Sequence, residues 1–421
     1  MSAGNTAWVL VSSALVLFMT PGLAFYYAGM VRAKNVLSML MQNYFVMGIV
    51  SIVWALVGFS LAFGKDAGFG LIGNFGFAGL LHLGLKGHIP GYSGSSALSI
   101  PPLAFMIFQM MFAIITAGLI TGATADRLKF SSFAIFITLW SLLVYSPVAH
   151  WVFSPNGWLF KLGALDFAGG TVVHINSGMA GLAVAIVIGK RKGWPKEPMP
   201  PHSLPLTLLG AGMLWFGWFG FNAGSALGAN ELAAQAFVNT QLATAGGLLA
   251  WLLVEKFKDG HPTTLGAASG AVAGLVAITP ACGYVNPLSS IVIGILAGAV
   301  CSVAVRIKFR FGFDDALDVV GVHVVGGIIG ALSLGFLATT SINSAGSNGL
   351  FFGGGISLLG VQTLAVVSVM VFSFVASFIL AKVIDKTFGL RVSRVDEEEG
   401  LDMTQHSEAA YSLSGTGRFG Q

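Results

Sequence analysis

Residues 101–124 read PPLAFMIFQMMFAIITAGLITGAT, a run of 24 residues without one charged side chain. The hydrocarbon core of a bilayer needs about 20 apolar residues per helix, so this run predicts a membrane crossing. The rest of the chain has the same character, because 55% of its 421 residues are hydrophobic and only 9% are charged. A soluble domain carries about 25% charged residues. The composition therefore excludes a soluble enzyme, a nucleic-acid binder and a disordered chain.

Ten further apolar runs predict an all-α integral membrane protein with eleven transmembrane helices. The eleven expected spans are 6–31, 37–63, 101–124, 131–152, 167–189, 203–226, 232–254, 263–280, 287–305, 319–339 and 354–381. The first span could be mistaken for a signal peptide. It has no basic segment before its apolar run, however, and it leads directly into Arg32 and Lys34. We therefore expect the first span to be retained.

The basic residues predict the direction in which the chain crosses the membrane. One set of alternate loops, together with the tail, holds 18 of the 21 Lys and Arg residues. The opposite set holds only Lys65, Lys86 and Lys161. Because cytoplasmic loops collect Lys and Arg, we expect a multi-pass protein of the cytoplasmic membrane with its N-terminus outside and its C-terminus inside.

Short sequence matches recur between spans that are five apart. His174 in span 5 is followed by glycines four and seven residues later, and His323 in span 10 has glycines at the same offsets. Five spans are an odd number, so the second half must enter the membrane from the opposite side. We expect two inverted five-helix repeats, at about 6–190 and 203–340, followed by a long eleventh helix at about 354–385. Such repeats place the substrate path at their interface, near the middle of the bilayer.

His174 and His323 are the strongest functional candidates, since ionisable groups inside membrane spans are rare and costly. Dehydration favours the neutral imidazole, so we expect a neutral pair that shares one hydrogen bond. A neutral imidazole both donates and accepts, which suits a small neutral solute. The alternative is two unrelated core histidines, each bonded to a main-chain carbonyl. No thiolate or carboxylate stands at ligand spacing and no nucleophile lies nearby, so we expect neither a metal site, nor a cofactor, nor an intramembrane enzyme.

Four carboxylates stand beside these two spans. Asp166 and Asp318 each precede a helix start, where a carboxylate caps main-chain donors and favours the positive end of the helix dipole. We expect a structural role for both, with direct contact to the substrate as the alternative. Asp314 and Asp315 fall in a loop beside Arg310, and we expect them to be solvated.

Several longer motifs match a known family in the order of its spans. They are Asp166–His174 (DFAGGTVVH), Gly217–Ser225 (GWFGFNAGS), Thr279–Tyr284 (TPACGY), Asp314–His323 (DDALDVVGVH) and, in the tail, Gly389–Val392, Glu399–Asp402 and Glu408–Tyr411. Over essentially its whole length the chain resembles the ammonium transporter family (Amt/Mep/Rh), and it is most similar to the bacterial and archaeal Amt branch.

The resemblance implies a homotrimer with a separate pore in each subunit. Each pore would recruit ammonium, or its analogue methylammonium, remove a proton and conduct ammonia, with or without the proton, through a hydrophobic passage. By motif position, His174 and His323 would be the twin pore histidines. Phe112 and Phe221 would form a stacked aromatic gate.

The resemblance also implies an ammonium recruitment site on the outer side of the gate. Phe108 and Ser225 would line this site, with Asp166 supporting it. The family usually has Trp at the position of Phe153, and Phe offers a weaker face to a cation. Affinity at the outer site is therefore expected to be reduced unless Trp151 turns inward.

The resemblance divides the chain into a transmembrane domain, 1–385, and a cytoplasmic regulatory tail, 386–421. The tail would couple subunits, and the cytoplasmic signal protein PII would block the inner pore mouths. The family usually has Gly at the position of Ser407, so the local turn is expected to differ. Two alternatives remain: an ammonium sensor, although the tail is shorter than a typical output domain, and a neutral gas channel of the Rh type.

Overall fold

The computed structural model describes residues 1–84, 88–93 and 97–411, and this part of the chain is helical without any β-strand. Within it, ten helices are long and apolar enough to cross a membrane, and an eleventh apolar helix of 15 residues is shorter. All eleven expected spans are helical. The expected all-α membrane fold is therefore confirmed. Lys86 and the end of the tail, 412–421, lie outside the described residues.

The first five spans include the segment that carries His174. They are α1 (Ala3–Met30); α2 (Val36–Val53) continued by η2 (Trp54–Gly58) and α3 (Phe59–Phe63); α4 (Pro102–Thr124); α5 (Phe130–Trp140) continued by η5 (Ser141–Tyr145) and α6 (Ser146–Phe153); and η6 (Gly170–Ile175) continued by α8 (Asn176–Ile188). The short helix α7 (Trp158–Lys161) and the turns η1 (Ala33–Asn35) and η3 (Ala78–Leu80) lie in the connections.

The remaining spans include the segment that carries His323. They are α9 (Leu204–Gly224), α10 (Glu231–Asp259), α11 (Thr264–Ile278), α12 (Pro287–Ala304), η7 (Val320–Val324) continued by α14 (Val325–Leu337), and α15 (Ser357–Phe388). The short helix α13 (Ile307–Phe311) and the turn η8 (Leu350–Phe352) lie between them, and α16 (Arg394–Glu399) and α17 (Leu401–His406) form the tail. Span 8 is shorter than expected because Pro280, which lacks an N–H, follows α11 closely.

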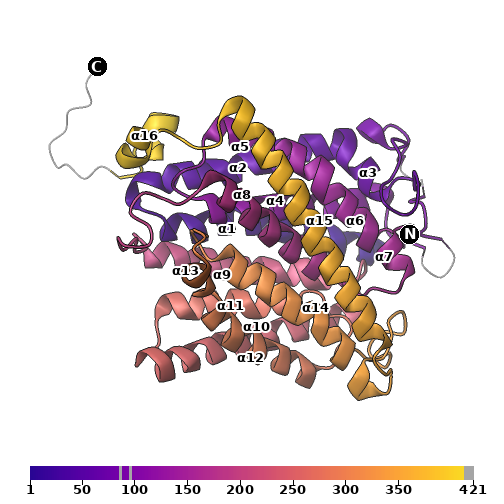
Figure 1. Ribbon diagram of the computed structural model, residues 1–421. Helices are drawn as coiled ribbons and strands as arrows, with labels where there is room; N and C mark the ends of the chain where they lie inside the picture. Colours follow the sequence, from indigo (N-terminus) through magenta and orange to yellow (C-terminus); the bar gives the residue numbers. More distant parts are fainter. Residues whose placement is uncertain (85–87, 94–96, 412–421) are drawn as a thin grey trace.

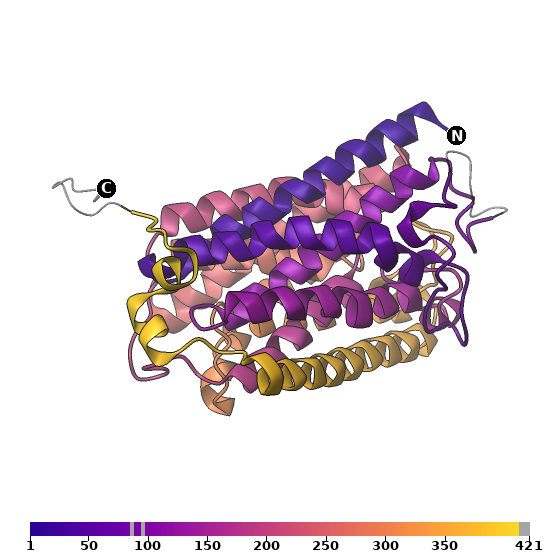
Figure 2. The same ribbon diagram turned by 90° about the horizontal axis from the view of Figure 1, so that it is seen from above.

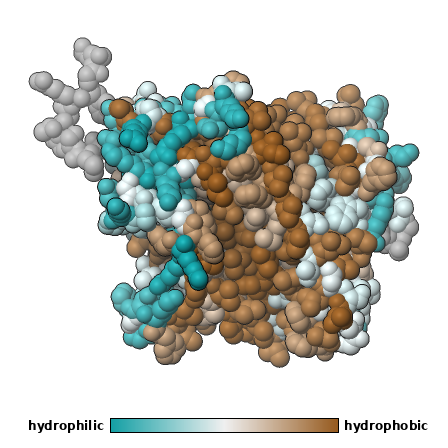
Figure 3. Space-filling model, in the orientation of Figure 1, coloured by the Kyte–Doolittle hydropathy of each residue, from teal (hydrophilic) through white to brown (hydrophobic). Residues whose placement is uncertain are grey.

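The long helices form a bundle of roughly aligned rods, and α15 runs obliquely over one face of it (Figures 1 and 2). In the space-filling view a broad apolar band separates hydrophilic residues at the tail end from a smaller polar region at the opposite end (Figure 3). The band extends over the exposed surfaces of the long helices. This distribution is that of a multi-pass membrane protein.

Glycines allow the helices α10 and α12 to approach closely. A Cβ atom on Gly294 would lie 2.1 Å from the carbonyl oxygen of Ala243, and one on Gly298 would lie 2.1 Å from that of Gly247. Any larger side chain at these positions would force the two helices apart. Small residues at helix contacts are the usual means of packing inside lipid, where the hydrophobic effect supplies little attraction.

Two of the spans begin with a π-helical turn, and each of these turns carries one of the candidate histidines. His174 lies in η6 and His323 lies in η7, and the two turns pack against each other. A π turn widens the helix by one residue per turn and occurs often at functional sites. Periodicity in the sequence did not reveal these turns.

Candidate functional site

The two candidate histidines meet inside the bundle. His174 Nδ1 lies 3.2 Å from His323 Nδ1, and the ring centroids are 5.3 Å apart. Both side chains are almost completely buried. In a hydrogen bond between the two Nδ1 atoms one ring donates and the other accepts, so at least one imidazole is neutral. The contact expected from the sequence pattern is present.

Aromatic side chains hold the histidine pair from one side. The Trp218 indole stacks on His174 at 5.4 Å between centroids, and its Nε1 donates a hydrogen bond of 2.9 Å to Thr279 Oγ1. This bond fixes the plane of the indole and hence the surface on which the imidazole rests. Sequence reasoning did not single out Trp218, although it lies in the Gly217–Ser225 motif.

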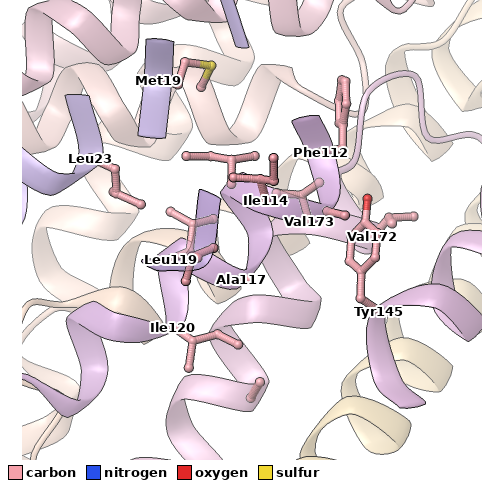
Figure 4. Packing of buried hydrophobic residues seen from close by; sticks show 14 of the residues in the cluster. Met19, Leu23, Phe112, Ile114, Ala117, Leu119, Ile120, Tyr145, Val172 and Val173 are labelled. Atoms are coloured by element: carbon pink, nitrogen blue, oxygen red, sulfur yellow. The ribbon is translucent and has the colours of Figure 1, made fainter. Parts of the chain in front are cut away.

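A narrow apolar cavity of about 10 Å³ runs beside the two rings. It is lined by Met19, Leu23, Tyr26, Ile115, Leu119, Val173, His174, Leu214, Trp218, Phe221, Val272 and His323. Figure 4 shows Met19 and Leu23 of α1, Leu119 of α4 and Val173 of η6 in the same part of the interior. The volume is about that of a single small molecule such as water. We refer to this space as the histidine lumen.

Three phenylalanines pack in series beside the histidine lumen, and one of them, Phe221, lines it. The rings of Phe112 and Phe221 lie 4.4 Å apart, and Phe108 packs edge-on against Phe112 at 4.9 Å. Phe221 in turn lies 6.1 Å from the ring of His174. All three phenylalanines are buried. A continuous file of rings therefore leads from Phe108 to the histidine pair.

A second, larger cavity of about 160 Å³ lies on the other side of these rings. We call it the aromatic cavity; its lining residues are Tyr92, Gln109, Phe112, Val152, Phe153, Phe160, Ala164, Asp166, Phe167, Ser225, Leu227 and Tyr284. Phe112 lines the aromatic cavity and Phe221 lines the histidine lumen, so this pair separates the two spaces; the rings are tilted by 39° rather than stacked as expected.

The expected recruitment residues are only partly brought together. Phe153 and Ser225 line the aromatic cavity, whereas Phe108 lies behind Phe112. Trp151 does not turn inward: its Nε1 donates to the Leu71 carbonyl at 2.8 Å, and its ring packs on Phe372. Sequence spacing could not decide this direction, because Leu71 and Phe372 are far from Trp151 in the chain.

Asp166 caps the start of span 5, as its position predicts. Its Oδ1 accepts from the N–H groups of Gly169 and Gly170, both at 2.7 Å. Its Oδ2 accepts from the N–H and hydroxyl of Thr171, at 2.8 and 2.5 Å, and from the Val172 N–H at 3.3 Å. The carboxylate therefore satisfies the free donors of the π-helical turn that carries His174.

The cap of span 10 is Asp315, and the expectation that Asp318 caps this span was wrong. Asp315 accepts from the N–H groups of Val319 and Val320 at 3.1 and 2.7 Å. Asp318 instead adopts a left-handed conformation with φ of 62° and forms an ion pair of 2.6 Å with Lys308. A signal was present in the sequence, since Asp166 and Asp315 each precede their histidine by eight residues.

Asp314 and Asp315 are also not solvated, contrary to expectation, because both are 1% exposed. Asp314 binds the Arg191 guanidinium through both oxygens at 2.9 Å. Burial acts to raise the pKa of Asp314, but the bonds from Arg191 and the charge of Arg127 outweigh it and leave that pKa below its usual value. Burial raises the pKa of Asp315 to about 6.

The described part of the tail lies against the loops at one end of the bundle. Asp402 Oδ1 accepts from the Ser38 N–H at 2.8 Å and so caps α2 from a distant part of the chain. The buried Glu397 accepts from Arg391 at 2.6 Å and from the Lys192 N–H at 2.7 Å. The tail is therefore attached to the start of α2 and to the loop that follows span 5.

A bundle of membrane-spanning helices with buried cavities between them is typical of polytopic membrane transport proteins. A sequence profile described as the Ammonium Transporter Family matches residues 7–411. The chain belongs to this family, which indicates a transporter of ammonium rather than an enzyme.

Curated relatives and solved structures agree with this assignment. The ammonium transporter of Mycobacterium tuberculosis is 51% identical, with 98% of this chain and 91% of the relative covered. Ammonium transporter Amt1 of Archaeoglobus fulgidus is 47% identical, with 98% and 100% covered. The structure of Mep2 from Saccharomyces cerevisiae is similar with a TM-score of 0.84 and 36% identity, over 94% of this chain and 88% of that one.

Proposed function

We propose that the protein recruits ammonium at the aromatic cavity, removes one proton and passes ammonia through the histidine lumen. The observation that carries this proposal is the arrangement of the two spaces, which are separated by Phe112 and Phe221. One space is lined by aromatic rings and a hydroxyl, and the other has an almost entirely apolar surface and contains the paired imidazoles. The aromatic cavity thus accommodates a cation, and the histidine lumen accommodates the neutral molecule that follows from it.

Magnitudes favour deprotonation over passage of the intact ion. Moving a bare ion into a low-dielectric interior costs tens of kcal/mol. An ammonium ion with a pKa roughly 2–3 units above neutral loses its proton for about 3–4 kcal/mol, at 1.36 kcal/mol per unit. The histidine lumen has almost no oxygen atoms that could replace a hydration shell. Ammonia, by contrast, is able to exchange hydrogen bonds with His174 and His323.

The aromatic cavity provides three kinds of attraction for a cation. Phe112 and Phe153 contribute aromatic rings to its lining, and Ser225 donates its hydroxyl proton to the Phe221 carbonyl, which leaves the oxygen lone pairs available. The oxygens of Asp166 are already occupied by five donors. Asp166 therefore attracts the cation through its charge rather than as a direct ligand.

The larger arrangement follows from the same proposal. Two inverted five-helix repeats are supported by the matching aspartate-to-histidine spacing and by the packing of α1 on α9. The exposed apolar surface of the long helices is suited to lipid and to the other subunits of a homotrimer. The basic loops support an outside N-terminus and a cytoplasmic tail, 386–421. Membership of the family supports the signal protein PII as the partner of this tail.

The test is uptake of methylammonium by proteoliposomes that contain the wild-type protein or the double variant His174→Ala, His323→Ala. The proposal expects the double variant to lose selective uptake, while His261→Ala, on an exposed loop, behaves like wild type. Unchanged uptake and ion selectivity in the double variant would refute the proposal.

Currents recorded from the same vesicles during ammonium pulses decide whether the proton follows the ammonia. A current indicates that the proton crosses, with the histidine pair as its relay. Uptake without current indicates a neutral gas channel of the Rh type.

A further inference from the structure

Helix α15 lies outside the two expected repeats, yet its buried face carries a side chain that contacts both histidine-bearing segments. Gln362 is completely buried among apolar neighbours on α15. Its Oε1 accepts from the Leu165 N–H at 2.7 Å, and its Nε2 donates to the Leu165 carbonyl at 2.8 Å and to the Ala331 carbonyl at 3.0 Å. The amide orientation is unambiguous, because a main-chain N–H can donate only to the oxygen.

These three bonds connect two distant parts of the site. Leu165 directly precedes Asp166, the cap of the turn that carries His174. Ala331 lies on α14, eight residues after His323, or about 12 Å along a helix. One side chain therefore ties the entrance of span 5 to the helix that continues from the second histidine.

A second contact from the same face of α15 holds span 5 on the other side of its histidine. Ser373 Oγ donates to the carbonyl of Asn176 at 2.7 Å, two residues after His174. Gln362 and Ser373 are eleven residues, about three helical turns, apart on α15. In Figure 1, α15 runs across the bundle over both α8 and α14. It thus braces span 5 both before and after the π-helical turn.

We propose that Gln362 is a positioning residue for transport, which sets the place of Asp166 and His174 relative to His323. The proposal rests on the function given above. Removal of the amide leaves the N–H and carbonyl of Leu165 without partners and allows this segment to move independently of α14. Because the histidine lumen holds only about one small molecule, small shifts of its walls alter what it admits.

The experiment compares Gln362→Met with Ser377→Ala in proteoliposomes. Met has a similar length but forms none of the three bonds. Ser377 is the matched control, since it lies on the same buried face of α15 and accepts a hydrogen bond of 3.0 Å from Trp140 Nε1, which is in span 4. Both variants lose buried polar contacts of α15, but only Gln362→Met releases the histidine-bearing segments.

We expect Gln362→Met to raise the KM for methylammonium about three- to tenfold, the effect of one buried hydrogen bond of roughly 1 kcal/mol, and to change the preference between ammonium and methylammonium. A purely structural role would lower Vmax through fewer active molecules and leave KM and preference unchanged. KM and preference equal to wild type, or shifted equally in Ser377→Ala, would overturn the inference.

Ser373→Ala keeps the inference testable if Gln362→Met does not assemble in the membrane. It removes one hydroxyl, and we expect KM to rise about twofold; an unchanged KM overturns the bracing role. Absence of methylammonium uptake by the wild-type protein would instead refute the proposed function itself, so the two failures are distinguishable.

Discussion

Substitution of Asp166 by Asn examines whether the cap of span 5 holds the candidate site together. The change preserves the shape of the side chain and replaces one oxygen by an amide nitrogen. Oδ1 serves two main-chain N–H groups, and Oδ2 serves two more together with the Thr171 hydroxyl. Whichever oxygen is replaced, at least two main-chain donors lose their acceptor and face another donor.

Each orphaned buried donor costs about 1–3 kcal/mol, so Asp166→Asn is expected to destabilise the protein by about 2–6 kcal/mol. The lower part of this range is favoured because Asp166 lines the aromatic cavity, where water can replace a lost partner. The turn η6 begins at Gly170, and loss of its cap also loosens the position of His174. Transport is therefore expected to fall together with stability.

The assay is thermal unfolding of the detergent-solubilised protein, measured beside methylammonium uptake. Asp259→Asn is the control, because Asp259 forms a surface ion pair with Arg306 that contributes little to stability. The reasoning is refuted if Asp166→Asn retains the wild-type Tm and uptake, or if Asp259→Asn is destabilised to the same extent.

Three further changes test other parts of the site. Phe153→Trp is expected to lower the KM for methylammonium about two- to fivefold, since a stronger cation–π contact contributes roughly 0.5–1 kcal/mol. Trp151 lies outside the cavity, so Trp151→Phe is expected to leave KM unchanged. A KM that changes in Trp151→Phe but not in Phe153→Trp would contradict the role of Phe153 in cation binding. The pKa of Asp315 is raised to about 6 in the folded protein, so the folded state binds this proton more tightly than the unfolded state does. The resulting contribution to stability is complete only below about pH 4, the pKa of an aspartate in the unfolded chain. This contribution, at most about 3 kcal/mol, is lost as the pH rises through 6, so Tm measured against pH should decline over that interval in wild type and less in Asp315→Asn. Glu397→Gln is expected to speed trypsin cleavage of the tail roughly tenfold or more, because a buried charged hydrogen bond is lost. The control is Glu398→Gln at an exposed position, and equal cleavage rates in the two variants would show that Glu397 does not hold the tail in place.

Much of the site was readable from local sequence. The histidines stand out because charged or ionisable groups are scarce in apolar spans, and the repeated glycine offsets relate one histidine to the other. The resemblance motifs placed Phe112, Phe221 and Ser225 near the same passage, and the structure brings these residues to its two cavities. Apolar runs in the sequence identified all eleven spans, and each of them is helical in the structure.

Three features were decided by the folded chain. Asp315 rather than Asp318 caps span 10, since Asp318 has a left-handed backbone and its side chain pairs with Lys308. Asp314 is buried because Arg191, from the connection after span 5, reaches it. Trp151 turns away from the cavity because a loop carbonyl accepts its indole N–H.

The amino-acid sequence by itself determined the number and type of the spans, the two histidines and the tail, because hydropathy and the scarcity of charge are local properties. Only the tertiary structure decided which aspartate caps which helix, where the rings separate the two cavities, and that Gln362 joins the two histidine-bearing segments. The physical reason is that a polar side chain inside a membrane protein must satisfy its hydrogen bonds within the protein. The partner it finds depends on how segments far apart in the chain are packed together.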